Sequence, residues 1–137
     1  MKGAYILLVN LFEPLVMKVS RNEWFFKPGL YAYVGSAMNS LERRISRHLA
    51  KNKKKHWHID YLLEKATVQL VLMIRSDEKI EEEISRIFAK YFECIENFGA
   101  SDLRVKSNLF YIDSTRKFFE VVSSIHSQGF EKSRSSE

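Results

Sequence analysis

The order of two hydrophobic periodicities along the chain constrains its fold more than any other feature. β-rich runs and turn residues come first, and apolar residues at helical spacing follow in residues 41–49 and 80–95. Elements of both kinds have a face to bury, so they must pack against one another. The pattern predicts an α/β (α+β) fold, with helices packed on a small antiparallel or mixed sheet.

The predicted strands are separated by short turns. Residues 3–10 are predicted to form a hairpin with 15–20, an extra N-terminal strand joined through the turn at Glu13-Pro14. Pro28-Gly29 makes the next turn, before a strand at 31–35. The β-rich runs at 67–74 and 109–112 complete the predicted sheet.

Four helices are predicted. Asn39 or Ser40 caps the first, and Glu42 stands at capping-box distance from Asn39. The second covers 57–63. The third covers 77–95, with acidic residues in its first turns, where the helix dipole favours them. The last follows Asp113-Ser114 and is predicted to end at Gly129.

The 137 residues fit a single domain, predicted at 1–128, followed by a charged, Ser-rich tail at 129–137 that is expected to fray. A single cysteine, Cys94, excludes an internal disulfide and a cysteine-based zinc cluster. The longest nearly apolar run, 68–74, is too short to span a bilayer, and the chain starts without a signal-peptide pattern. We expect a soluble, cytoplasmic protein without a membrane partner.

Basic residues gather in one segment. The net charge is +5, and seven Lys or Arg residues stand between 43 and 55 without an acid. They are Arg43, Arg44, Arg47, Lys51, Lys53, Lys54 and Lys55. Such a segment fits a surface that binds a polyanion. It also fits a solvated helix face followed by a lysine-rich loop.

Two tripeptides pair a glycine with a tyrosine: Gly3-Ala4-Tyr5 and Tyr33-Val34-Gly35. In a strand, residues two apart point to the same side, and a glycine there lets another group approach over the tyrosine ring. Each tyrosine alone also fits an ordinary core or surface position.

Two further positions suggest chemistry on phosphate. Arg44 and His48 are four apart, so they share a helix face and can converge on one anion. Helical spacing places Glu81 on the apolar stripe of its helix, whereas Glu82 points away and Glu83 falls outside the stripe. A carboxylate on the packed side needs a cation as partner. The alternative for Arg44 is an exposed side chain with a histidine nearby.

Together these residues resemble the GIY-YIG nuclease superfamily. The order is Gly-x-Tyr, Tyr-x-Gly, Leu-x-x-Arg-x-x-x-His and a later Glu, spread over residues 3–112. The sequence is still more similar to a compact branch, of the domain of unknown function 123 type, whose members are largely unassigned. The runs shared with that branch are 28–37, 44–48, 56–62 and 98–102.

The resemblance implies one-metal hydrolysis of phosphodiesters. Tyr5 would act as, or assist, the general base, and Tyr33 would hold the network by hydrogen bonding. Arg44 would stabilise charge on the phosphoryl oxygens with help from His48, and Glu81 would bind Mg²⁺ or Mn²⁺. A free phenol, with a pKa of about 10, is a poor base at neutral pH, so nearby cations would have to lower it.

Further residues are predicted to contact nucleic acid. They are Gly35, Ser36, Arg43, Arg47, Lys51, Lys53, Lys54, Lys55, His56, Trp57 and His58. Trp57 or Tyr61 could stack on a base. His56 and Asp60 are four apart and could instead ligate a metal, but the favoured interpretation is that Asp60 caps the helix or orients a histidine.

Three departures from the superfamily pattern stand out. Ala4 and Val34 replace isoleucines, and the spacing from Tyr5 to Tyr33 is long, which we attribute to the extra strand. Asn97 and Asn108 compete for a late asparagine position, where the closer branch has histidine at 108. Glu83 is the fallback carboxylate.

The leading functional hypothesis is a metal-dependent DNA endonuclease, structure-selective or weakly sequence-dependent, in repair or recombination. RNA stays open as a substrate, and a repair protein is an expected partner. One alternative is a catalytically silent nucleic-acid-binding module. Another is an interaction domain whose basic face binds an acidic protein.

Overall fold

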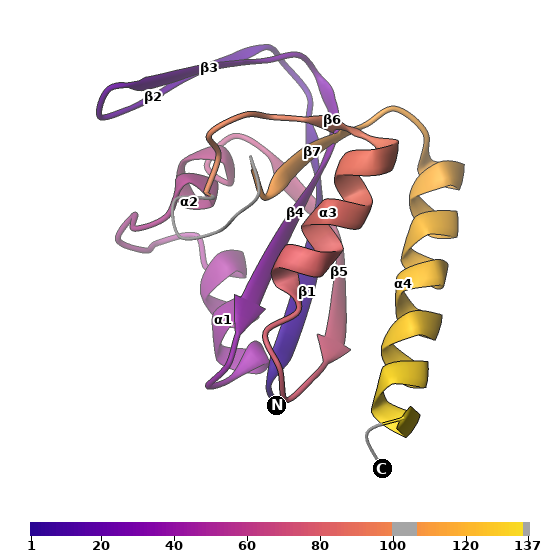
Figure 1. Ribbon diagram of the computed structural model, residues 1–137. Helices are drawn as coiled ribbons and strands as arrows, with labels where there is room; N and C mark the ends of the chain where they lie inside the picture. The colour runs from indigo at the N-terminus through magenta and orange to yellow at the C-terminus, as the bar shows by residue number, and fades with distance from the viewer. Residues whose placement is uncertain (100–106, 136–137) are drawn as a thin grey trace.

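The protein, described here by a computed structural model, has the predicted α+β class (Figure 1). The structure describes residues 1–99 and 107–135, with side chains to residue 125. Its central sheet has five antiparallel strands in the order β5-β1-β4-β7-β6. Their bounds are β1 (Gly3–Leu11), β4 (Gly29–Ala37), β5 (Thr67–Arg75), β6 (Glu93–Cys94) and β7 (Leu109–Ile112).

Helices cover both faces of the sheet because side chains of its central strands are apolar on both sides. On β1, Tyr5 and Leu7 point into one core, and Ala4 and Ile6 point into the other. The first core includes side chains of α1 (Leu41–Leu49) and α2 (His58–Leu62). The second includes side chains of α3 (Glu81–Tyr91) and α4 (Thr115–Ser135), which lie side by side (Figure 1). No helix in the described ranges is long and apolar enough to cross a bilayer.

The predicted pairing of residues 15–20 with the first strand is wrong. Strand β2 (Leu15–Val19) pairs with β3 (Asn22–Phe26), a strand that the hydrophobic pattern did not predict, in a separate two-stranded sheet. The turn is hard to recognise because it uses Ser20, with a φ of 54°, where glycine or asparagine would be typical. The hairpin projects at the top of Figure 1, and its Trp24 packs into the first core.

Two predicted helix boundaries are also wrong. The helix expected at 77–95 is confined to Glu81–Tyr91, because the backbone becomes extended at Phe92 and then forms β6. The last helix does not stop at Gly129 but continues to Ser135, since one glycine inside a helix costs only about 1 kcal/mol. Residues 100–102 of the predicted 98–102 motif lie outside the described residues.

The end of β4 has one edge without a paired strand among the described residues, and the candidate site lies there. Strand β7 pairs with β4 only from Leu30 to Tyr33, and the Val34 amide donates to the Asn108 carbonyl. Beyond Val34, no other strand among the described residues occupies this edge of β4. Helices α1 and α3, which pack on opposite faces, both begin near this end of β4 (Figure 1). Side chains from the two faces can therefore meet around the open edge.

Candidate functional site

A pocket of about 250 Å³ lies at the open edge of β4. Four elements supply its main polar groups: Tyr5 from β1, Tyr33 from β4, Arg44 from α1 and Glu81 from α3. Although α3 packs on the opposite face of the sheet from Tyr5, Glu81 is its first residue and reaches the same pocket. Further lining comes from Gly35, Ser36, His56, Trp57, His58, Lys79, Gly99 and Asn108.

Gly35 makes room for the Tyr5 ring. The two residues are opposite each other in the antiparallel register of β1 and β4. A Cβ atom at position 35 would lie 2.2 Å from Cζ of Tyr5, a distance that no real side chain tolerates. The group that packs closely over Gly35 is thus Tyr5, the tyrosine of the first tripeptide. Tyr33 stands beside them, with its ring centroid 6.3 Å from that of Tyr5.

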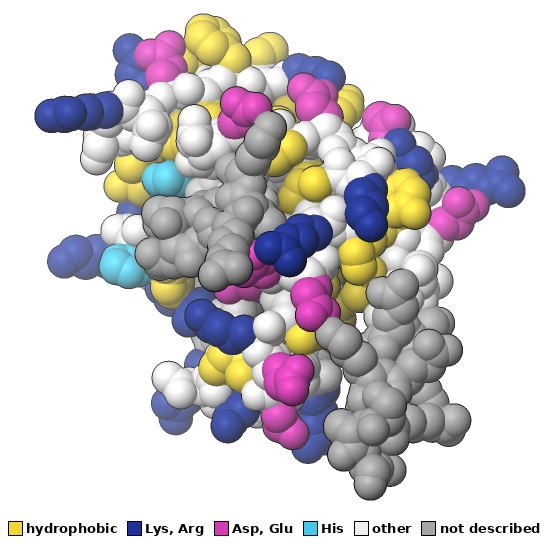
Figure 2. All heavy atoms as spheres, in the orientation of Figure 1, with side chains coloured by type: hydrophobic (Ala, Val, Ile, Leu, Met, Phe, Trp, Pro, Cys, Tyr) yellow, Lys and Arg dark blue, Asp and Glu magenta, His cyan; other side chains and the backbone are white. Residues whose placement is uncertain are grey.

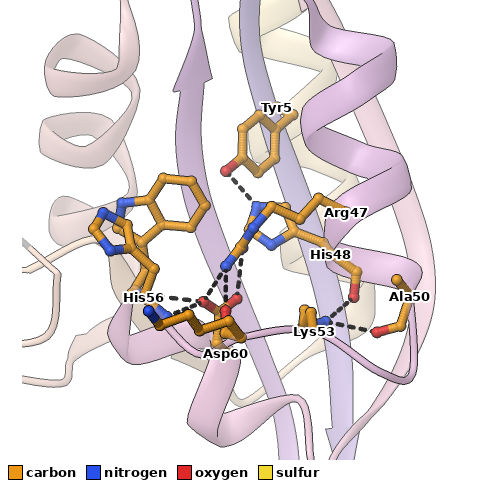
Figure 3. Close-up of polar contacts among 9 residues, drawn as sticks. Tyr5, Arg47, His48, Ala50, Lys53, His56 and Asp60 are labelled. Atoms are coloured by element: carbon orange, nitrogen blue, oxygen red, sulfur yellow. Dashed lines mark hydrogen bonds and ion pairs between the residues drawn. The ribbon is translucent and has the colours of Figure 1, made fainter.

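Tyr5 and His48 form a buried hydrogen-bonded pair (Figure 3). The hydroxyl oxygen of Tyr5 lies 2.7 Å from Nε2 of His48. Burial raises the pKa of Tyr5 to about 12, although the positive charge of Arg44 opposes the rise. Burial also lowers the pKa of His48 to about 4. At neutral pH the histidine is therefore uncharged, and the tautomer of its ring decides which of the two groups donates this hydrogen bond.

Tyr33 closes one side of the pair. Its ring lies 6.2 Å from the His48 ring, and burial raises the pKa of its hydroxyl well above the usual range. The hydroxyl makes no hydrogen bond to any residue within 1–99 and 107–125. Within the described residues, Tyr33 packs as an aromatic wall beside the pair, and its hydrogen-bonding role stays a prediction.

Arg44 is held in place by two contacts. Its Nη1 donates to the Ser36 carbonyl at 2.9 Å, and its guanidinium lies 4.4 Å from the centre of the Trp57 ring. A planar guanidinium fixed against an aromatic ring presents its remaining N–H groups in one geometry. Those groups line the pocket beside Tyr5.

Arg47 and Asp60 have a structural role instead. Both Asp60 oxygens accept from Arg47, at 2.9 and 2.8 Å, and Oδ2 also accepts from the amides of His56 and Trp57 (Figure 3). Burial alone would raise the pKa of Asp60, but these hydrogen bonds outweigh it and lower the pKa to about 2. The helix-capping interpretation of Asp60 is confirmed, and both its oxygens are occupied.

The basic segment divides into anchored and exposed residues. Lys53 donates to the carbonyls of His48 and Ala50 at the end of α1, and Lys55 pairs with Glu64. Arg43, Lys51 and Lys54 are exposed. The face in Figure 2 carries basic and acidic side chains side by side, not one continuous basic surface.

The three residues 56–58 differ in their surroundings. His56 is exposed and borders the pocket. His58 is half-buried: its Nδ1 accepts from the Gly99 amide at 3.0 Å, and its ring packs on Trp24. His58 therefore ties the hairpin and the segment before residue 100 to the site.

Glu81 is the acidic residue that the pocket offers to a metal. Glu82 pairs with Arg86, and Glu83 is exposed and does not line the pocket. Within the described ranges, no group of three or more His, Cys, Asp or Glu residues could hold an ion by itself. Mg²⁺ keeps several waters and uses one or two carboxylates together with substrate phosphates, so one pocket carboxylate fits that ion.

Sequence reasoning missed Lys79 and did not choose Asn108. Lys79 was assigned to the helix interior, but the helix begins at Glu81 and Lys79 lies on the loop that borders the pocket. Asn108 accepts from Ser85 and donates to the Gly99 carbonyl at the pocket wall. Asn97 is exposed in a turn with a φ of 62°.

One protein family matches most of the chain, namely the domain of unknown function DUF123, over residues 4–130. Comparisons with curated proteins and with solved structures gave no match.

Proposed function

We propose that this chain, which belongs to the domain of unknown function DUF123 family, is a nuclease of the GIY-YIG type that hydrolyses phosphodiester bonds in DNA with one Mg²⁺ or Mn²⁺ ion. The observation that carries the proposal is the meeting of Tyr5, Arg44 and Glu81 in one pocket, from three separate elements. Residues that pack for stability alone need no such convergence of a proton carrier, a fixed cation and a carboxylate.

The Tyr5–His48 pair supplies a path for the proton of the attacking water. A phenol with a pKa of about 12 carries almost no phenolate at neutral pH, so Tyr5 is a weak base by itself. Its oxygen can accept the water proton while its own proton moves to Nε2 of His48, 2.7 Å away. The water becomes hydroxide, the histidine becomes imidazolium, and Tyr5 ends neutral.

Arg44 meets the negative charge that grows on the phosphoryl oxygens. Its contacts with Ser36 and Trp57 fix the guanidinium before substrate binds, so little reorganisation is needed during reaction. Lys79 adds a second positive charge at the pocket rim. Glu81 would hold the metal ion, which supplies Lewis-acid polarisation of the phosphate.

DNA is the proposed substrate, and repair or recombination in the cytoplasm is the proposed setting, with a repair protein as partner. The exposed Arg43, Lys51 and Lys54 support a polyanionic substrate because their charges are not spent on structural contacts to described residues.

The test is incubation of the protein with branched, flapped and linear DNA and RNA, with Mg²⁺ or Mn²⁺ and with chelator as control. We expect metal-dependent cleavage of at least one DNA form. Tight binding without cleavage in either metal would replace the enzyme with the silent binding module. Absence of binding at moderate salt would favour the protein-interaction domain.

A further inference from the structure

A second hollow adjoins the pocket. Ser36, Arg44, Trp57, Lys79 and Glu81 line both, so the two hollows lie next to each other at these residues. Its other lining comes from the turn between β4 and α1 and from the outer side of α1, including Arg43. We call this second hollow the flanking groove.

The flanking groove has a hydrogen-bond donor, Arg43, that makes no ion pair with the described side chains. This residue is exposed. Arg47 also borders the groove but is held by Asp60, and Arg44 and Lys79 lie at the part shared with the pocket, so Arg43 is the cation of the groove's own lining that can contact a ligand. Glu81 is the acidic residue of the lining, at the part shared with the pocket.

Ser36 marks the junction of the two hollows. Its hydroxyl oxygen is buried and has no hydrogen-bond partner among the described residues. A buried hydroxyl without a partner costs free energy, so it favours a ligand that supplies an acceptor. A phosphate oxygen bound beside Ser36, whose carbonyl already accepts from Arg44, would supply that acceptor.

We propose that the flanking groove is a subsite for the phosphate next to the one that is cleaved, with Arg43 as its contact residue. The inference rests on the proposed function, because the pocket must hold the scissile phosphate. It specifies the substrate further: a polynucleotide strand with a charged neighbouring linkage, rather than a diester with one phosphate.

The experiment compares Arg43→Gln with Arg21→Gln, which removes the same charge in the turn between β2 and β3. Steady-state kinetics are measured on the oligonucleotide that the parent cuts best and on bis(4-nitrophenyl) phosphate, which has one phosphate. We expect Arg43→Gln to lower kcat/KM on the oligonucleotide roughly tenfold, mainly through KM. The loss on the small diester should be several times smaller, and Arg21→Gln should behave as the parent on both.

A modified substrate identifies the phosphate. A neutral methylphosphonate is placed on either side of the mapped cleavage position. On one side it should lower parental kcat/KM by a similar factor, and Arg43→Gln should then add no further loss. Equal losses on both substrates, or a loss that neither neutral linkage reproduces, would overturn the subsite while the nuclease function stands.

If the parent cuts neither substrate, the proposed nuclease function has failed. The flanking groove is then judged by fluorescence anisotropy with a labelled oligonucleotide. Binding weakened several-fold by Arg43→Gln but not by Arg21→Gln supports a phosphate subsite, and equal binding by the two variants rejects it.

Discussion

The hydroxyl of Tyr5 lies 2.7 Å from Nε2 of His48, and both side chains are buried between β1 and α1. Burial acts on the two groups in opposite directions, because it disfavours a charged phenolate and a charged imidazolium alike. The pair is therefore neutral at rest, with the proton on the phenol. A proton relay is the role that we propose for this neutral pair.

Tyr5→Phe should abolish most turnover. Without the hydroxyl, the relay is broken, and we expect cleavage to fall by roughly 10²- to 10⁴-fold with DNA affinity retained. The free energy of unfolding should fall by about 1–3 kcal/mol, since His48 loses its partner. Tyr31→Phe is the matched control: its hydroxyl donates to the Lys27 carbonyl, away from the pocket. Equal cleavage rates in the two variants would show that the Tyr5 hydroxyl takes no part in the reaction.

Stability should rise with pH between about 4 and 6.5 because of His48. In this window the unfolded chain protonates the imidazole, which has its ordinary pKa of 6.5 there, but the folded chain keeps it neutral down to about 4. The unfolded state binds more protons in this range, so acid favours unfolding, by roughly 3 kcal/mol over the window. Urea unfolding at a series of pH values measures the slope. His48→Gln should flatten it in part, since His58 also has a lowered pKa. An unchanged slope would contradict the assignment.

The fold class followed from patterns that do not depend on tertiary contacts. The runs that became β1, β4, β5 and β7 are rich in apolar residues, and α1 carries a regular stripe with Ser40 as its cap. Strand β3 was missed because the β2–β3 turn lacks a typical turn residue and the apolar run of β3, Trp24–Phe26, is only three residues long. The third helix was overextended because its stripe continues into β6, where pairing with β7 overrides helical spacing.

Many of the residues that line the pocket were predicted from the sequence, among them Gly35, Ser36 and Trp57. Tyr5, Arg44 and Glu81 were chosen from motif order and helix spacing, and they line one pocket. The structural roles of Arg47 and Lys53 could not be predicted from the sequence. Arg47 contacts Asp60 and Lys53 contacts the His48 carbonyl only because of the path that the loop after α1 takes. Lys79 could not be recognised as a pocket residue from the sequence, because its place depends on where α3 begins.

Removing exposed lysines should weaken DNA binding in a salt-dependent manner. Lys51→Ala/Lys54→Ala should flatten the dependence of log Kd on log salt by up to about 2, because each duplex phosphate contact contributes about 0.9. Lys53→Ala should act mainly on stability, by about 1 kcal/mol, since the α1 carbonyls lose a donor. Titrations at several salt concentrations measure the slope. An unchanged slope in the double variant would mean that these lysines are only solvated.

Asp60→Asn should destabilise the protein by about 3 kcal/mol, because it leaves the Arg47 guanidinium without its carboxylate. The pKa of Asp60 is lowered, so its contribution is present above about pH 3.8 and is lost as pH falls towards 2. Denaturant unfolding at neutral pH checks the first statement. A loss below about 1 kcal/mol would show that Arg47 finds another partner.

The most direct test of the nuclease proposal compares Glu81→Ala with Glu83→Ala. The two residues are neighbours in the first turn of α3, but only Glu81 lines the pocket. Single-turnover cleavage with Mg²⁺ or Mn²⁺ and the Kd for the same DNA are measured for both variants and the parent. We predict that Glu81→Ala loses metal-supported cleavage while its affinity for DNA is kept or raised, because a negative charge near phosphate is gone. Glu83→Ala should cut as the parent does. Parental cleavage rates in Glu81→Ala would contradict the assignment of the carboxylate, and a parent that binds DNA but cuts nothing with either metal would contradict the nuclease itself.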